Sequence, residues 1–177
     1  MTVIVEGPDN SGKSTLTEEL ANALGTTVIH SGGPVLDQHE ADIREKVLYE
    51  RPSNTLYDRI PLISEMIYGP IIRGVHFYTA DSFKRFCLEK RPVVIYCRPP
   101  DKYLLDWSTH REGKFDTKHH TKSIKSNEGE IVEAYDQLFF EELVSLDRNP
   151  IIYNWTHTPP GYKNLIIDEI LKMELGS

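Results

Sequence analysis

The sequence predicts an α/β fold with three layers, in which helices cover both faces of a five-stranded parallel β-sheet. Three observations support this prediction. Short runs of β-branched residues alternate with longer helical stretches along the chain, which is typical of parallel strands joined by crossover helices. The strand candidates are apolar at nearly every position, as expected of strands buried on both faces. A glycine-containing loop joins the first strand to the first helix, at the edge of the sheet where such folds bind ligands.

The elements follow one another in a regular order. The expected strands are rich in β-branched and aromatic residues and read TVIVE, TTVIH, NTLYD, PVVIYC and PIIYN, at residues 2–6, 26–30, 54–58, 92–97 and 150–154. The expected helices occupy the stretches between and after them, at residues 13–24, about 38–50, 61–73, 79–90, 100–109, 124–146 and 162–174. Right-handed crossovers then bring the carboxyl ends of all five strands to one edge of the sheet.

Length and composition indicate one domain over residues 1–177. The chain is long enough to bury a single substantial core. No apolar run approaches the roughly 20 residues that span a bilayer, and the N-terminus predicts a strand rather than a signal peptide. Cys87 and Cys97 show no metal-binding or redox spacing. We therefore expect reduced thiols in a cytoplasmic protein with no membrane partner.

The charge is negative overall but uneven along the chain. A formal net charge of −7 disfavours a general nucleic-acid-binding protein, because such proteins usually carry a basic face. Positive charge is concentrated at residues 111–125, with Arg111 and four lysines against two carboxylates. A cationic segment of this length suits a polyphosphate ligand better than a long duplex, so DNA is a possible but not a favoured partner.

Residues 110–123 are polar and lack periodicity, and two interpretations compete. The segment is either a solvated surface loop or a mobile lid that closes over transferring phosphates and excludes water. We favour the lid, because the preceding strand and helix deliver the segment to the expected ligand edge of the sheet.

Residues 7–14 read GPDNSGKS and match the phosphate-binding loop G-x-x-x-x-G-K-[ST] between a strand and a helix. Gly7 and Gly12 let backbone N–H groups turn toward an anion, and the following helix adds the positive end of its dipole. Lys13 can reach the β- and γ-phosphates, and Ser14 is the expected Mg²⁺ ligand. The motif predicts a P-loop NTPase fold that binds a nucleoside triphosphate, with ATP and Mg²⁺ as the expected cofactors. The loop residues assigned to this role are Gly7, Asn10, Ser11, Gly12, Lys13, Ser14 and Thr15.

Asp58 ends the third expected strand after an apolar run. At the carboxyl edge of the sheet it would lie next to the phosphate loop if the two strands are neighbours. It could then hold a Mg²⁺-bound water or act as general base toward an acceptor hydroxyl. The alternative is an N-cap for the following helix, and the two roles are compatible. No N-K-x-D motif that reads guanine occurs, which disfavours a GTPase.

Arg59 and Arg73 bracket the helix that follows Asp58. Both are suited to bidentate contacts with phosphate. Ser64 and Tyr68 lie one turn apart on that helix and share a face, so they could line one wall of a pocket. The spacing therefore indicates a pocket wall flanked by two arginines that suit phosphate.

This segment resembles the D-R…S-x-x-x-Y…R-G pattern of the thymidylate kinases, within the thymidylate kinase and deoxynucleoside kinase branch of the P-loop kinases. The matching residues are Asp58, Arg59, Ser64, Tyr68, Arg73 and Gly74, with one extra residue between Arg59 and Ser64. Glu6, Gly7 and Asp9 match the E-G-x-D form of the family's phosphate loop, and residues 31–34 (SGGP) are similar to its P-G-G-T loop. The resemblance spans most of the chain.

The resemblance implies further roles. Asp9 would approach the 3′-hydroxyl of an acceptor sugar, and Arg111 would be a lid arginine near the transferring phosphate. The loop at Trp155 would pack against the donor adenine, with a simple surface loop as the alternative. Arg98 departs from the family, which has an acidic turn after the fourth strand, and it adds charge at the phosphate edge. The family's enzymes are commonly homodimers. The chain differs at Gly69, where the family usually has the glutamine that helps to read the pyrimidine.

We therefore expect ATP- and Mg²⁺-dependent phosphoryl transfer to a deoxynucleoside monophosphate. The expected catalytic residues are Lys13, Asp58, Arg59 and Arg111; the acceptor residues are Asp9, Arg59, Ser64, Tyr68 and Arg73; the metal residues are Ser14 and Asp58; Arg98 and Trp155 join the donor site. One alternative is a kinase that acts on a hydroxyl of a deoxynucleoside, or of a modified base or an end in DNA. A nucleotide-binding regulatory ATPase is the other.

Overall fold

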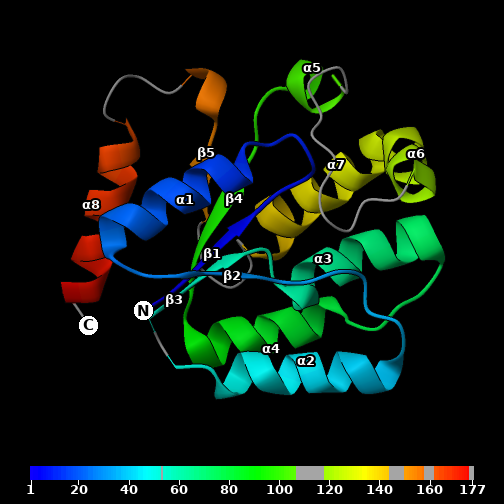
Figure 1. Cartoon of the computed structure of the whole chain (residues 1–177), viewed down its shortest axis with the longest axis horizontal. Coiled ribbons are helices and arrows are strands. Elements are labelled where there is room, and N and C mark those ends of the chain that lie inside the picture. The colour runs from blue at the N-terminus through cyan, green and yellow to red at the C-terminus, as the bar shows by residue number, and fades with distance from the viewer. Residues whose placement is uncertain (53, 107–117, 144–149, 158–161, 176–177) are drawn as a thin grey trace.

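The computed structural model describes residues 1–52, 54–106, 118–143, 150–157 and 162–175. Five parallel strands form one sheet in the order β2-β3-β1-β4-β5 (Figure 1). Their bounds are β1 Thr2–Glu6, β2 Val28–His30, β3 Thr55–Asp58, β4 Val93–Cys97 and β5 Ile151–Tyr153. The predicted five-stranded parallel sheet is confirmed, although β2 and β5 are shorter than expected.

The central strand β1 brings the two halves of the sheet together. It pairs with β3 on one side, where Val5 lies opposite Asp58, and with β4 on the other, where Glu6 lies opposite Tyr96. The strand order reverses at β1, and in open α/β sheets the carboxyl edge at such a point is where ligands bind.

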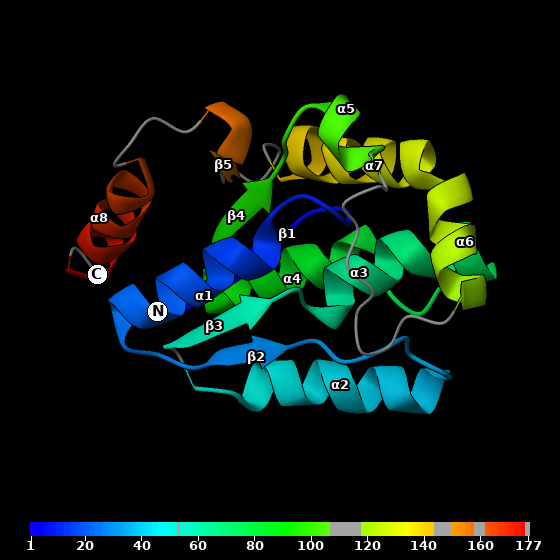
Figure 2. The same ribbon diagram turned by 45° about the horizontal axis from the view of Figure 1, so that its top comes forward.

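Helices cover both faces of the sheet (Figures 1 and 2). Their bounds are α1 Lys13–Leu24, α2 Gln38–Glu50, α3 Pro61–Tyr68, α4 Ala80–Lys90, α5 Asp101–Leu104, α6 Lys118–Ser126, α7 Glu128–Gln137 and α8 Tyr162–Leu175. Successive strand residues point to opposite faces, so Val3 and Val5 of β1 pack in one core with α1 and α8. Ile4 between them packs in the other core, to which α2, α3, α4 and α7 contribute.

The helix expected at residues 61–73 is only partly α-helical. The α-helix ends at Tyr68, and a π-helical turn at Gly69–Arg73 continues it. Pro70 has no N–H to donate within this turn, and the N–H of Gly74 and that of Val75 both reach back to the Gly69 carbonyl. The widened turn leads the chain away from the sheet after Arg73.

The prediction of one continuous helix at residues 124–146 was wrong in its bounds. The structure has α6 from Lys118, a break at Asn127, then α7 and a π-helical turn at Leu138–Glu142. The Asn127 side chain donates to the Ser123 carbonyl at 2.8 Å, and such a local bond competes with helix continuation. Residues 118–123, which we expected in an irregular lid, are therefore helical. The rest of that segment, and residues 107–109 of the helix expected at 100–109, lie outside the described residues.

In the described parts of the chain, the helices all fall short of the length and apolarity that crossing a membrane requires.

Candidate active site

The phosphate loop adopts a conformation that requires its two motif glycines. Gly7 has φ 147° and Gly12 has φ 84°, both in the region that favours glycine. A Cβ on Gly7 would lie 2.5 Å from the Cys97 carbonyl oxygen, and one on Gly12 would lie 2.8 Å from Cδ1 of Trp155. The loop is therefore packed tightly between the end of β4 and the segment that follows β5.

Lys13 lies folded back onto this loop. Its Nζ donates to the Pro8 carbonyl at 2.5 Å and to Ser11 Oγ at 3.2 Å. Burial, together with the nearby charge of Arg59, lowers the pKa of Lys13 to about 8, against the opposing effect of Asp9. A buried ammonium that faces a second cation is poised for an anionic ligand, because phosphate oxygens would restore the charged form.

Ser14 and Asp58 come together, as expected for neighbouring strands β1 and β3. Ser14 Oγ donates to Asp58 Oδ2 at 3.4 Å, and His30 Nδ1 lies 3.3 Å from the same oxygen. One hydroxyl and one carboxylate are a donor set that suits Mg²⁺, which prefers oxygen ligands and completes its shell with waters and phosphate oxygens. These residues therefore fit the predicted metal site. No larger cluster of three or more metal-binding side chains occurs among the residues that the structure describes.

Arg59 links the phosphate loop to the acceptor-side helix. Its backbone has φ 66°, which is uncommon for an arginine and costs about 1 kcal/mol or more. One terminal nitrogen donates to Asp9 Oδ1 at 2.7 Å, to the Gly7 carbonyl at 3.2 Å and to the Tyr68 hydroxyl at 3.1 Å. The structure thus brings Asp9, Arg59 and Tyr68 together, as the sequence predicted.

Glu6 is a site residue to which the sequence analysis assigned no role. It is fully buried at the end of β1 and accepts hydrogen bonds from the Ile60 N–H, the Tyr135 hydroxyl and the Gly7 N–H, at 2.8, 3.1 and 3.3 Å. Burial raises the pKa of Glu6 to about 7, although Arg59 opposes the shift. The carboxylate thus joins the start of the phosphate loop at Gly7 to the β3–α3 connection at Ile60. The signal in the sequence that could have revealed this role is an acidic residue at the end of an otherwise apolar strand.

Glu128 is the second residue that the sequence analysis missed. It is 2% exposed at the start of α7, and both carboxylate oxygens are buried without a hydrogen-bond partner in the described structure. Burial, reinforced by the charge of Asp9, raises the pKa of Glu128 to about 8, while Lys13 and Arg59 oppose this. Glu128 therefore directs an unsatisfied acceptor toward the cluster around Asp9. The sequence hinted at its burial only by spacing: Glu128 lies at helical spacing from Ile131 and Tyr135, on the apolar face of the helix.

Two of the predicted phosphate-binding arginines are paired with carboxylates instead. Arg73 forms an ion pair with Glu65, and its Nε is buried without a partner in the described structure. Arg98 makes a bidentate contact with Asp136, at 2.8 Å for both nitrogens, and also pairs with Asp101. Both contacts hold the guanidinium groups between elements of the fold. The assignments of Arg73 and Arg98 to phosphate stay predictions.

The remaining predicted residues divide into three groups. Ser64 Oγ donates to the Ile60 carbonyl one turn earlier in the chain, a local helix contact. Asn10 donates to carbonyls near α5, and Thr15 is exposed in the first turn of α1. Trp155 lies against Gly12 and stays 40% exposed, with its ring centre 5.0 Å from that of Tyr103. Arg111 lies outside the described residues.

The comparisons with known proteins bear on the fold. No family model matches the sequence, and no curated protein matches it. The YorR protein of Bacillus subtilis, solved in complex with phosphorylated GDP, superposes with a TM-score of 0.69 at 14% identity, over 98% of this chain and 95% of that one. A deoxyadenosine kinase from M. mycoides superposes with TM-scores of 0.62 in its form with dCMP and dCDP and 0.61 with dCTP, at 15% and 16% identity. This chain covers all of that kinase, and 98% and 97% of this chain is matched. At these identities the likeness shows the fold, and the chain has an α/β P-loop NTPase fold.

Proposed function

We propose that this protein is a Mg²⁺-dependent kinase that transfers the γ-phosphoryl group of ATP to a deoxynucleoside monophosphate. The observation that carries the proposal is a continuous site with two halves. A phosphate loop with Lys13, Ser14 and Asp58 adjoins a polar cluster of Asp9, Arg59 and Glu128. A hydrolytic ATPase needs the first half only, whereas a phosphotransferase also needs a place for an acceptor.

The donor half supplies position and positive charge. Lys13 would leave the Pro8 carbonyl and turn to the β- and γ-phosphates, with the loop N–H groups around them. Ser14 and Asp58 would hold Mg²⁺, which neutralises charge on the phosphate oxygens when it is bound. Trp155 offers an exposed ring beside Gly12 on which a donor base can stack. Phosphoryl transfer is catalysed mainly by such positioning and electrostatics.

The acceptor half is suited to hydroxyl-rich ligands. Asp9 presents a carboxylate that accepts hydrogen bonds. Glu128, with its raised pKa, presents a buried carboxyl group that can donate one hydrogen bond and accept another, and buried polar atoms without a partner are costly until a ligand supplies one. The Arg59 guanidinium lies between Asp9 and Tyr68 and donates hydrogen bonds to both. The structural likeness to a deoxyadenosine kinase solved with dCMP supports a nucleoside-containing acceptor.

One observation favours a second candidate, a kinase whose acceptor is a hydroxyl group rather than a phosphate. Arg59 and Arg73, which the sequence assigned to the acceptor phosphate, are both ion-paired with carboxylates. An acceptor without a phosphate would leave these pairs intact. Asp58 would then serve as general base toward the hydroxyl of a deoxynucleoside, or of a base or an end in DNA.

A screen of acceptors tests both candidates. ADP formation from ATP is measured with deoxynucleosides, their monophosphates, single-stranded oligonucleotides and no acceptor. Transfer to monophosphates supports the first candidate, and transfer to nucleosides or DNA supports the second. With DNA, activity should fall steeply as salt rises. Hydrolysis that needs no acceptor would contradict both and indicate a regulatory ATPase.

Matched lysine variants give the control for this screen. Lys13→Met should abolish transfer. Lys46→Met removes an exposed lysine on α2 that forms an ion pair with Glu50, and it should leave the rate unchanged. Full activity in Lys13→Met would refute the assignment of the donor site.

A further inference from the structure

His30, the last residue of β2, lies beside the proposed metal pair of Ser14 and Asp58. In the register of the parallel strands, His30 of β2 lies opposite Asp58 of β3. Matched residues of neighbouring strands point to the same face of the sheet, about 4.8 Å apart. His30 Nδ1 accordingly lies 3.3 Å from Asp58 Oδ2, the oxygen that Ser14 Oγ contacts at 3.4 Å. One carboxylate oxygen therefore faces two further atoms that can bind a metal, a hydroxyl oxygen and an imidazole nitrogen.

The spacing of these atoms is closer to that of metal ligands than to that of strong hydrogen bonds. A charged histidine that donates to a carboxylate lies about 2.7–2.9 Å from it, and a hydroxyl that does so lies about 2.5–2.7 Å from it. Two ligands at right angles on an octahedral ion, with bonds of about 2.1 Å, lie about 3.0 Å apart. Both contacts of Asp58 Oδ2 exceed this spacing by only about 0.3–0.4 Å. Small side-chain rotations would therefore bring the three groups onto one ion.

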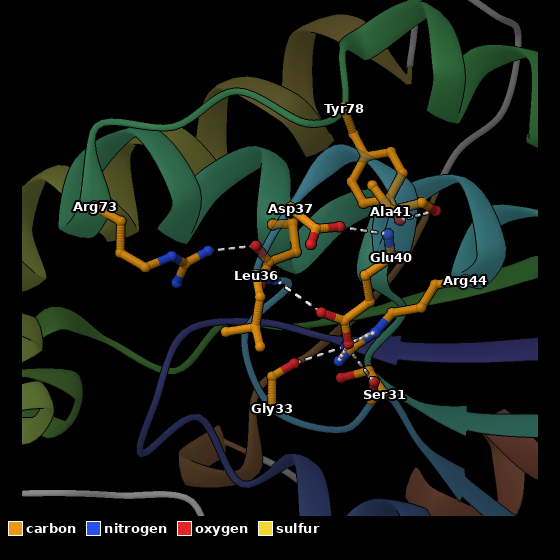
Figure 3. Close-up of polar contacts among 10 residues, drawn as sticks. Ser31, Gly33, Leu36, Asp37, Glu40, Ala41, Arg44, Arg73 and Tyr78 are labelled. Atoms are coloured by element: carbon orange, nitrogen blue, oxygen red, sulfur yellow. Dashed lines mark hydrogen bonds and ion pairs between the residues drawn. The ribbon is translucent and has the colours of Figure 1, made fainter.

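The backbone that carries His30 is held in place by contacts with β3 and with α2. The Ser31 N–H donates to the Asp58 carbonyl at 3.4 Å, which continues the pairing of β2 with β3 beyond His30. The Ser31 carbonyl accepts a hydrogen bond from Nη1 of Arg44 at 3.2 Å, and the same nitrogen donates to the Gly33 carbonyl at 2.7 Å (Figure 3). The backbone of His30 therefore has a defined place at the edge of the sheet, and only its side chain has to move to bind an ion.

Asp58 and His30 differ in exposure in a way that suits an ion shared with a nucleotide. The Asp58 side chain is 11% exposed, whereas that of His30 is 70% exposed. The carboxylate therefore forms the inner part of the site, and the imidazole stands at its open side. Waters and phosphate oxygens, which complete the shell of an octahedral ion, can approach from there.

An imidazole ligand changes which ions a site prefers. Mg²⁺ is a hard ion that prefers oxygen ligands. Imidazole suits ions of the first transition row, and affinity for a site with nitrogen and oxygen ligands rises from Mn²⁺ to Co²⁺. A site with one imidazole, one carboxylate and one hydroxyl therefore favours Co²⁺ or Mn²⁺ over Mg²⁺.

We propose that His30 is a third ligand of the ion that accompanies the nucleoside triphosphate, and that it gives the site a preference for first-row transition metal ions over Mg²⁺. This inference rests on the proposed donor site. Ser14 and Asp58 supply oxygen ligands only, and His30 adds the one nitrogen. Mg²⁺ still binds through the two oxygens and the phosphates, so the preference is one of relative affinity.

Mn²⁺ is the probe for this role, because pulsed electron paramagnetic resonance detects a nitrogen bound directly to this ion. Protein that carries ¹⁵N in the rings of its histidines is loaded with Mn²⁺ and a non-hydrolysable ATP analogue. Because the analogue and all other protein nitrogens are ¹⁴N, a ¹⁵N coupling can come only from a histidine ring. We expect this coupling in the wild type and its loss in His30→Ala.

Two further variants separate binding of the ion from a hydrogen bond to Asp58. His30→Asn keeps an N–H donor near the position of Nδ1 but has no imidazole nitrogen, and His39→Ala removes an exposed histidine on α2. Affinities are measured with the same analogue by titration of Mn²⁺, with Co²⁺ and Mg²⁺ as competitors. Circular dichroism checks that each variant is folded.

We expect the affinity for Co²⁺ to fall about tenfold or more in both His30 variants, because loss of even an outer-shell partner lowers metal affinity by about 10–100-fold. The affinity for Mg²⁺ should change less than about threefold, since this ion uses the oxygen ligands that remain. His39→Ala should match the wild type in both affinities and in the ¹⁵N coupling.

Three results would overturn the inference, and they differ from one another. Mn²⁺ that binds with the analogue but shows no ¹⁵N coupling overturns His30 as a ligand. Equal losses of Co²⁺ and Mg²⁺ affinity in His30→Ala, restored in His30→Asn, overturn it as well, because they show that His30 only orients Asp58. A wild-type protein that binds no Mn²⁺ with the analogue overturns the donor site itself, and with it the proposed function.

Discussion

Replacing Glu128 with glutamine separates two effects of this buried carboxyl group: its cost to the stability of the fold and its contribution to acceptor binding. The side chain is 2% exposed, and its oxygens have no hydrogen-bond partner in the described structure. Burial is the main reason that the pKa of Glu128 rises from its ordinary 4.5 to about 8. Because the pKa is raised in the folded state, the folded protein binds more protons than the unfolded chain between these values. Stability from this group is therefore greatest below pH 4.5 and is lost as the pH rises through 8.

The size of the effect follows from the shift. A rise from 4.5 to about 8 corresponds to at most about 5 kcal/mol at alkaline pH. The shift already includes the opposing effects of Lys13 and Arg59. Solvent screening reduces the energy further, so we expect glutamine to stabilise the protein by about 2 kcal/mol at pH 8. For a domain of this size, that gain raises Tm by roughly 4–8 °C. At pH 5 the variant and the wild type should differ little.

Thermal and urea unfolding at pH 5 and pH 8 measure this difference. Glu130→Gln is the matched control, because Glu130 lies in the same first turn of α7 but is exposed. It reports the loss of the favourable interaction with the helix dipole, about 0.3–1 kcal/mol. We further expect Glu128→Gln to raise the acceptor KM while it stabilises the fold. A stability difference that does not change with pH, or a less stable Glu128→Gln at pH 8, would refute the reasoning.

Three further outcomes are expected. Asp58→Asn should lower the rate at least about a hundredfold and raise the Mg²⁺ concentration needed for half-maximal rate, because a carboxylate ligand is lost; an unchanged Mg²⁺ titration would argue against Asp58 as a metal residue. In the wild type, kcat should fall as the pH drops below about 7, because protonation of Glu6, whose pKa is raised to about 7 by burial, removes an acceptor from the Gly7 or Ile60 N–H. Glu6→Gln should lose this pH dependence and should be slower at every pH, and a retained acid limb would assign it to another group. Trp155→Ala should raise the KM for ATP about five- to tenfold with the acceptor KM unchanged, as expected for loss of one stacking contact, and equal effects on both substrates would contradict a donor-side role.

Much of the donor half could be predicted from the sequence because its signals are local. The phosphate loop is one continuous motif, and the apolar strands on either side predict where it lies. Asp58 and Ser14 are far apart in the chain, yet the strand pattern placed both at one edge, and the structure brings their oxygens to 3.4 Å. Asp9, which the family resemblance assigned to the acceptor, and Tyr68 both contact Arg59.

The acceptor half could be predicted less well, because its contacts depend on where helices pack. The sequence placed Arg73 and Arg98 correctly on their elements, but it did not predict their carboxylate partners. Glu65 lies two turns before Arg73 on the same helical stretch, and Asp136, the partner of Arg98, comes from a distant segment. The bidentate pair of Arg98 with Asp136 leaves no local pattern in the sequence. The break at Asn127 was missed for a similar reason, since helical propensity alone continues through it.

The sequence by itself determined the layered fold, the phosphate loop and the edge of the sheet at which chemistry takes place. These follow from glycine conformations, from strands buried on both faces and from the handedness of crossovers. Only the tertiary structure decided which buried acids join the site. Glu6 receives the Tyr135 hydroxyl from 129 positions away, and Glu128 owes its raised pKa to burial, reinforced by the charge of the distant Asp9. The burial of these acids, and their contacts with residues far away in the sequence, depend on how helices pack on the sheet, which local sequence does not encode.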